Sequence, residues 1–237
     1  MSAAAWKARR GFRSALPIVL LVVVLLGGGV TAWLAVHSNS GPSSHVGPEG
    51  VLIYNVPNLA PATTTHAGQT VDGISCRKQA KETVKYHIHV HVEVYVDGKM
   101  MRLPAGIGIT NPPLLEKYSK GDFYDVGLYD CLYWLHTHVA DGVIHVEAPA
   151  KQTFTLGEFF DVWNQPLGPN QVGPAQGKVV VFENGKQLFG NPRSTQLLPH
   201  AVIQIDVGSP VVPFHQFPFK VTGGCGQGTL SCTTSTT

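Results

Sequence analysis

The segment Tyr86–Val96, with the sequence YHIHVHVEVYV, most constrains the fold, because its residue types alternate strictly. Every even position from Ile88 to Val96 is apolar, whereas the odd positions are polar or aromatic. Successive side chains of a β-strand point to opposite faces of a sheet. The segment therefore predicts a long strand with one face in a hydrophobic core. The row on the other face begins with His87, His89, His91 and Glu93.

Asp97-Gly98 follows this strand, and such a pair favours a two-residue hairpin turn. A turn there pairs Val94 with Met101. It also places Glu93 opposite Arg102, which predicts a cross-strand ion pair.

A second hairpin is predicted in residues 131–149, CLYWLHTHVADGVIHVEAP, with its turn at Asp141-Gly142. This turn places His138 opposite His145 and His136 opposite Glu147. Directly opposed side chains lie about 4.5–5.5 Å apart on one face of a sheet. The imidazoles can therefore converge on one point.

The remaining patterns complete a mainly β, β-rich α+β fold of antiparallel hairpins with one short helix. Asn184-Gly185 predicts a third hairpin, and residues 201–207 predict a last strand. Thr155 and Glu158 form a capping-box motif, which predicts a helix over Leu156–Trp163. The 26 glycines and 17 prolines agree with many turns.

An N-terminal transmembrane helix is predicted before this domain. Residues 1–14 form a basic segment, and residues 15–36 are uncharged and mainly apolar. Roughly 20 such residues cross a bilayer, and the preceding positive charges favour a cytoplasmic N-terminus. We therefore expect a single-pass anchor in the cell membrane and an extracytoplasmic C-terminal part, with a cleaved signal peptide as the alternative.

The exported part divides by composition into three segments. Residues 37–70 are rich in Gly, Pro, Ser and Thr and predict a flexible linker. Residues 71–219 predict the β-rich domain, and residues 220–237 predict a flexible tail. The formal charge of +2 gives no reason to expect nucleic acid as a partner. The membrane is the expected partner, and the sequence identifies no protein partner or substrate.

Export would place the four cysteines in an oxidising compartment. Of the three possible pairings, spacing favours Cys225 with Cys232 and hence Cys76 with Cys131. Four free thiols are the alternative.

The histidine rows predict a site for a transition metal ion. Zinc takes imidazole and carboxylate ligands, and Cu(II) accepts the same donors. The expected ligands are His136, His138 and His145, with Glu147 as a fourth ligand or a partner of the ligands. His87, His89 and His91 would assist if a Cys76–Cys131 disulfide joined the rows.

Three other interpretations of the polar face stay open. They are a metal-dependent enzyme, a pH-sensitive module that binds a cell-envelope partner, and a solvated polar sheet face. The chain has no phosphate-binding glycine loop, no GxSxG motif and no HExxH motif. The sequence therefore leaves open whether the protein is an enzyme.

The motifs HIHVHVEVYVDGK, LPAGIGI, CLYWLHTHVADGVIHVEAP and FTLGEFFDVW extend over about residues 74–212. In these motifs the chain resembles a bacterial family of membrane-anchored or exported histidine-rich proteins. The resemblance implies an exported, histidine-rich sheet and implies no reaction. The chain departs from the family at Val139, where members often carry Asp. The positions that match are Cys76, His87, His89, Cys131, His136, His138, His145 and Glu147.

Overall fold

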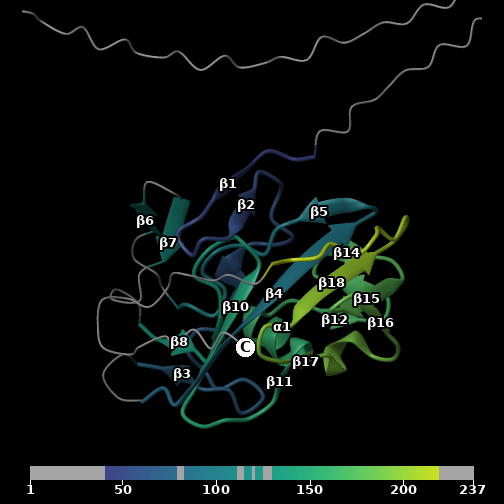
Figure 1. Ribbon diagram of the computed structural model, residues 1–237. Helices are drawn as coiled ribbons and strands as arrows, with labels where there is room; N and C mark the ends of the chain where they lie inside the picture. The colour runs from purple at the N-terminus through teal and green to yellow at the C-terminus, as the bar shows by residue number, and fades with distance from the viewer. Residues whose placement is uncertain (1–40, 79–82, 111–114, 119–120, 125–129, 219–237) are drawn as a thin grey trace, which may run out of the picture. The chain divides into compact units, whose positions relative to one another are not determined.

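The computed structural model describes residues 41–78, 83–110, 115–118, 121–124 and 130–218. Within these residues the main element is a seven-stranded sheet of order β16-β15-β18-β4-β10-β9, in which β5 also pairs with β4 (Figure 1). Its pairings are antiparallel except that of β18 with β4, which is parallel. The strands are β4 (Tyr86–Val96), β5 (Lys99–Met101), β9 (Leu135–His136), β10 (Val143–Ala148), β15 (Val179–Glu183), β16 (Lys186–Leu188) and β18 (Val202–Val207).

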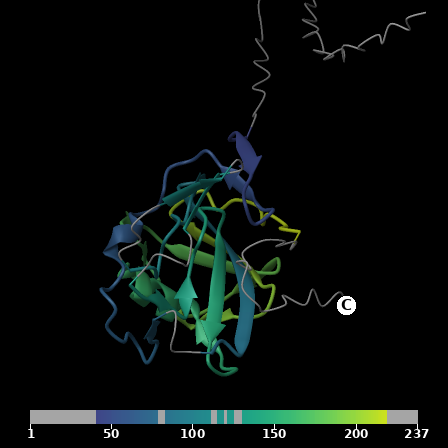
Figure 2. The ribbon, with the colours of Figure 1, turned by 90° about the vertical axis from the view of Figure 1, so that its left-hand side faces the viewer.

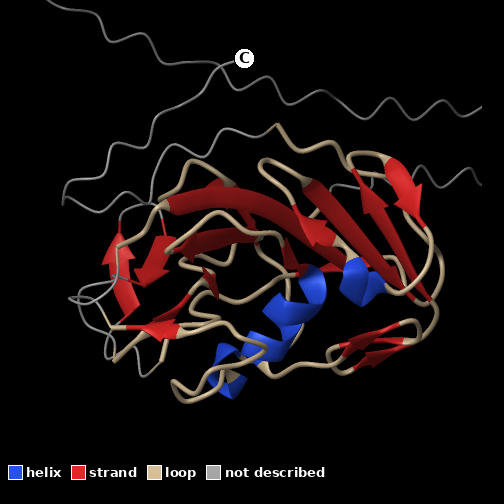
Figure 3. Cartoon of the chain, turned by 90° about the horizontal axis from the view of Figure 1, so that it is seen from below, coloured by secondary structure: helices blue, strands red, loops and turns tan. Residues whose placement is uncertain are grey.

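Short elements surround this sheet, and the helices lie on one side of its long strands (Figure 3). The helical segments are α1 (Leu156–Trp163) and the 3-10 turns η1 (Ala62–Thr64) and η2 (Pro192–Ser194). The paired short strands are β1 (Ser44–Val46) with β2 (Leu52–Tyr54), β3 (Cys76–Arg77) with β8 (Leu132–Tyr133), β6 (Leu115–Tyr118) with β7 (Gly121–Tyr124), and β11 (Phe154–Thr155) with β17 (Gln196–Leu197). A further sheet contains β12 (Leu167–Gly168), β13 (Gln171–Val172) and β14 (Ala175–Gln176).

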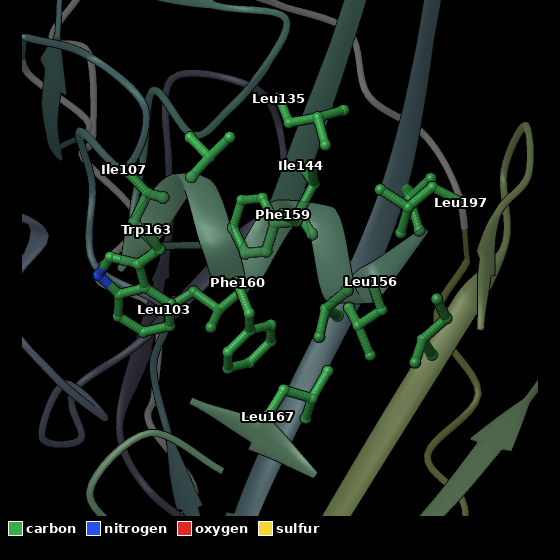
Figure 4. Packing of buried hydrophobic residues seen from close by; sticks show 14 of the residues in the cluster. Leu103, Ile107, Leu135, Ile144, Leu156, Phe159, Phe160, Trp163, Leu167 and Leu197 are labelled. Carbon is green, nitrogen blue, oxygen red and sulfur yellow. The ribbon is translucent and has the colours of Figure 1, made fainter. Parts of the chain in front are cut away.

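Helix α1 spans the predicted residues and supplies much of the core. The Thr155 side chain accepts from the Glu158 backbone N–H, and the Glu158 carboxylate accepts from the Thr155 N–H, so the predicted capping box is confirmed. Three aromatic side chains of α1 then pack with apolar residues of β9 and β10, all fully buried (Figure 4). Each such side chain contributes about 1.5–3 kcal/mol by leaving water.

The turn predictions at Asp97-Gly98 and Asn184-Gly185 are confirmed. All four residues have positive φ, between 49° and 83°, as a type I′ turn requires at its two central positions. The turn at Asp97 pairs Val94 with Met101, as predicted.

The predicted ion pair between Glu93 and Arg102 is wrong. Strand β5 ends at Met101, one residue before Arg102. The Arg102 Nε atom donates to Asn58 Oδ1 at 3.2 Å. Glu93 instead contacts His215, with 2.8 Å between Oε1 and Nδ1.

The second hairpin forms with a different register from the predicted one. His145 lies opposite His136, and Val146 lies opposite Leu135, so the pairing is shifted by two residues and the connection between the strands is longer. Side chains alternate with a period of two, so a shift of two residues keeps each on its expected face. The polar side chains therefore share one face, as predicted, although the predicted register is wrong.

Residues 41–70 differ from the expected flexible linker. They contain the β1–β2 hairpin, which Figure 2 shows in blue at the top of the view. They also bury Val51, Ile53 and Leu59. Apolar residues spaced among the glycines and prolines give this segment its own contacts with the domain.

The Cys76–Cys131 disulfide is present, as predicted, and joins β3 to the residue that precedes β8. The described residues contain no helix that is long and apolar enough to cross a membrane. The basic segment 1–14, the predicted span 15–36 and the tail 220–237 with Cys225 and Cys232 lie outside the described residues.

Candidate metal centre

Three neighbouring strands build the histidine-rich face. Strand β10 lies between β4 and β9, and its register places His145 opposite both His89 and His136. One step along the same face, Glu147 lies opposite His87. Opposed residues of adjacent strands share a face, so the two predicted rows form one continuous cluster.

The four expected ligands His136, His138, His145 and Glu147 come together in this cluster. Each offers a ligand atom, and these atoms all lie within 4.8 Å of one another. The Nε2 atoms of His136 and His138 are 3.2 Å apart, and His136 Nε2 is 3.9 Å from Glu147 Oε1. The three histidines are at most 1% exposed, so they form a preassembled donor set shielded from solvent.

The loop after β9 holds His138 in place through its neighbour Thr137. The Thr137 hydroxyl donates to the Pro104 carbonyl at 2.8 Å and accepts from the Ile107 N–H at 3.1 Å. These buried hydrogen bonds fix the backbone next to His138 and so help to position its imidazole.

His136 and His145 each direct one ring nitrogen to an acceptor. The Nδ1 atom of His136 lies 2.9 Å from the Tyr133 carbonyl oxygen, to which it donates. The Nε2 atom of His145 lies 3.1 and 3.2 Å from the two carboxyl oxygens of Glu49. Such partners fix the ring orientation and leave the opposite nitrogen for a metal ion. These opposite nitrogens are His136 Nε2 and His145 Nδ1, and the latter has no hydrogen-bond partner among the described residues.

The Glu49 side chain is the member of this centre that sequence reasoning missed. It lies in the β1–β2 turn, where Gly47 N–H donates to the Val51 carbonyl at 2.7 Å, and it is fully buried. A lone glutamate in a Gly/Pro-rich stretch shows no periodicity. The apolar residues Val51 and Ile53 after it were the one available signal that the segment packs on the domain.

Burial governs the protonation of the cluster. Desolvation, and then repulsion from Glu147, raises the pKa of Glu49 to about 8. Desolvation and neighbouring imidazoles lower the pKa of His145 to about 3 and that of His89 to about 2, and the pKa of His136 lies well below its usual range. These three imidazoles are therefore neutral at pH 7, which is the form that binds metal ions.

Glu147 connects this centre to the disulfide-linked strand β3. Its Oε2 atom accepts from Arg77 Nη2 at 2.7 Å. Arg77 follows Cys76 directly, so the disulfide also anchors the residue that orients this carboxylate. The Oε1 atom faces His136 and His87 instead, at 3.9 and 3.6 Å from their Nε2 atoms.

His87 and His89 form a second group with His145, again with ligand atoms within 4.8 Å of one another. The ring centroids of His89 and His145 are 4.5 Å apart, and those of His87 and His89 are 4.7 Å apart. The expected participation of these two residues beside the first group thus agrees with their positions.

His91 lies outside both groups, in contrast to its expected assisting role. Its Nε2 atom donates to the Asp141 carbonyl at 3.1 Å, and its ring stacks on Phe217 with 3.6 Å between centroids. His91 pairs with Val143 on β10, whereas His145 pairs with His89. Its position at the far end of the row gives it a packing role.

No family model, curated protein or solved structure matches this chain.

Proposed function

We propose that the chain is a membrane-anchored, extracytoplasmic protein that binds a transition metal ion, Zn²⁺ or Cu²⁺. The ligands are His136, His138 and His145, with Glu147 as the fourth. Three imidazoles and one carboxylate complete a tetrahedral shell for zinc, and Cu²⁺ accepts the same donors.

The observation that carries this proposal is the pairing of the non-ligating ring nitrogens. His136 donates to a backbone carbonyl and His145 contacts a buried carboxyl group. Buried polar groups that converge without compensating charge are costly. A divalent cation would offset that cost, because it would attract both Glu147 and an ionised Glu49.

The convergence of both histidine rows supports metal binding over a pH-sensitive surface, for which the rows would face solvent separately. The near-complete burial of the three imidazoles supports a site for an ion rather than for a larger substrate. The anchor is proposed from the basic residues before 15–36 and from the apolar character of that run.

Elemental analysis of the purified full-length chain tests the proposal. We expect bound zinc or copper in the wild type, and its loss in a His136→Ala/His138→Ala variant. The matched control is His45→Ala/His66→Ala, which removes two histidines outside both groups. Circular dichroism spectra would verify that each variant folds. Metal content that is absent throughout, or unchanged by the first variant, would contradict the proposal.

A further inference from the structure

The cluster contains more donors than one tetrahedral ion can use. Such an ion takes four ligands, whereas the two groups together offer six side chains. Among the described residues, the buried His89 Nε2 atom has no hydrogen-bond partner. The six side chains are His87, His89, His136, His138, His145 and Glu147.

The two groups share His145, and Glu147 lies between them. The Glu147 Oε1 atom is 3.6 Å from His87 Nε2 and 3.9 Å from His136 Nε2. The His145 ring is similarly central, with its centroid 4.5 Å from that of His89 and 4.7 Å from that of His138. Arg77 donates to Glu147 Oε2, so Glu147 Oε1 remains to contact both groups.

We propose that the cluster is a two-ion centre in which Glu147 Oε1 is shared by a pair of divalent transition metal ions. This proposal rests on the proposed function. One ion is held by His136, His138 and Glu147, and the other by His87, His89 and His145. With the shared Glu147, the first ion has three protein ligands and the second has four, because His145, a ligand of a single bound ion, coordinates the second ion when both are bound. Metal pairs of this kind lie about 3.5–4 Å apart.

Two carboxyl groups can balance the charge of a second ion: Glu147 directly, and Glu49 once a bound cation favours its ionised form. Glu49 contacts His145 from the side of the β1–β2 turn, and Glu147 contacts both groups. The second ion is also the more accessible one, because the His87 side chain is 27% exposed while that of His136 is fully buried. We therefore expect the second ion to bind and dissociate faster than the first.

Titration of the metal-free full-length chain with Co²⁺, followed by its visible absorption, counts the ions. We expect two equivalents for the wild type and for the His45→Ala/His66→Ala control, and one for His87→Ala/His89→Ala. His87 and His89 are not fully buried, so this variant has the better prospect of folding. Loading with Cu²⁺ adds a test of proximity. Spin coupling between two Cu²⁺ ions should broaden the electron paramagnetic resonance spectrum of the wild type and disappear in His87→Ala/His89→Ala.

The outcomes separate the two proposals. One equivalent in the wild type, unchanged in His87→Ala/His89→Ala, would overturn the two-ion centre and leave the single-ion site standing. Two equivalents with an uncoupled Cu²⁺ spectrum would also overturn it, because the ions would then be distant. No bound ion in any protein would overturn the proposed function and the two-ion centre together.

Discussion

Replacing Glu49 by Gln should have opposite effects on the metal-free and the metal-bound protein. In the metal-free protein the carboxyl group is fully buried and its pKa is raised from 4.5 to about 8. Below pH 4.5 a raised carboxyl pKa does not lower the free energy of unfolding, because both the folded and the unfolded chain hold the proton. The cost grows as the pH rises toward 8, because only the unfolded chain then releases the proton readily.

At pH 7 this linkage amounts to about 3 kcal/mol of lost stability. Glutamine has the same shape and does not titrate. Metal-free Glu49→Gln should therefore be more stable than the wild type by up to about 3 kcal/mol at pH 7, with the gain vanishing near pH 4.5. In the metal-bound protein the same change replaces the carboxylate that accepts from the His145 ring by a neutral and weaker amide acceptor, and losing such a carboxylate partner typically weakens metal affinity about 10–100-fold.

Urea unfolding of chelator-treated protein at pH 7 and pH 4.5 measures the first effect, and competition with a chromophoric chelator measures the second. Glu183→Gln on β15 is the control, since β18 lies between that strand and β4, the first strand of the histidine cluster. A metal-free Glu49→Gln protein that is less stable than wild type at pH 7, or that binds metal equally well, would refute the reasoning.

Three further predictions concern stability, each measured by urea unfolding. Thr155→Ala removes the helix cap and should cost about 1 kcal/mol; no loss would mean that packing alone holds α1. Replacing Cys76 and Cys131 together by Ser opens a loop with a sequence separation of 55 residues and should cost about 4 kcal/mol; a change below about 1 kcal/mol would contradict the chain-entropy model. Gly142→Ala should cost more than Gly190→Ala, because both have positive φ but only the Cβ at 142 would lie 2.6 Å from a β4 carbonyl oxygen; equal losses would show that the close contact relaxes.

Local sequence patterns predicted the elements that depend on neighbouring residues. The alternation in β4, the turns at Asp97-Gly98 and Asn184-Gly185 and the capping box of α1 act over a few positions, and each is present. The polar face was predicted despite a register error of two residues, because an even shift keeps every side chain on its face.

Contacts between distant segments had no such local signal. The pairing of β4 with β10, the parallel addition of β18 and the placement of His91 outside the cluster depend on which strands meet. From the sequence alone, the alternating strand Tyr86–Val96 could pair equally well with any of several other strands.

The sequence by itself thus determined which residues share the polar face, because side-chain alternation is a property of the strand. Only the tertiary structure decided that His87 and His89 stand beside His145 and that the Glu49 carboxyl group is buried against it. The physical reason is that a carboxyl group acquires a raised pKa and an imidazole partner only when a remote segment folds over it and excludes water.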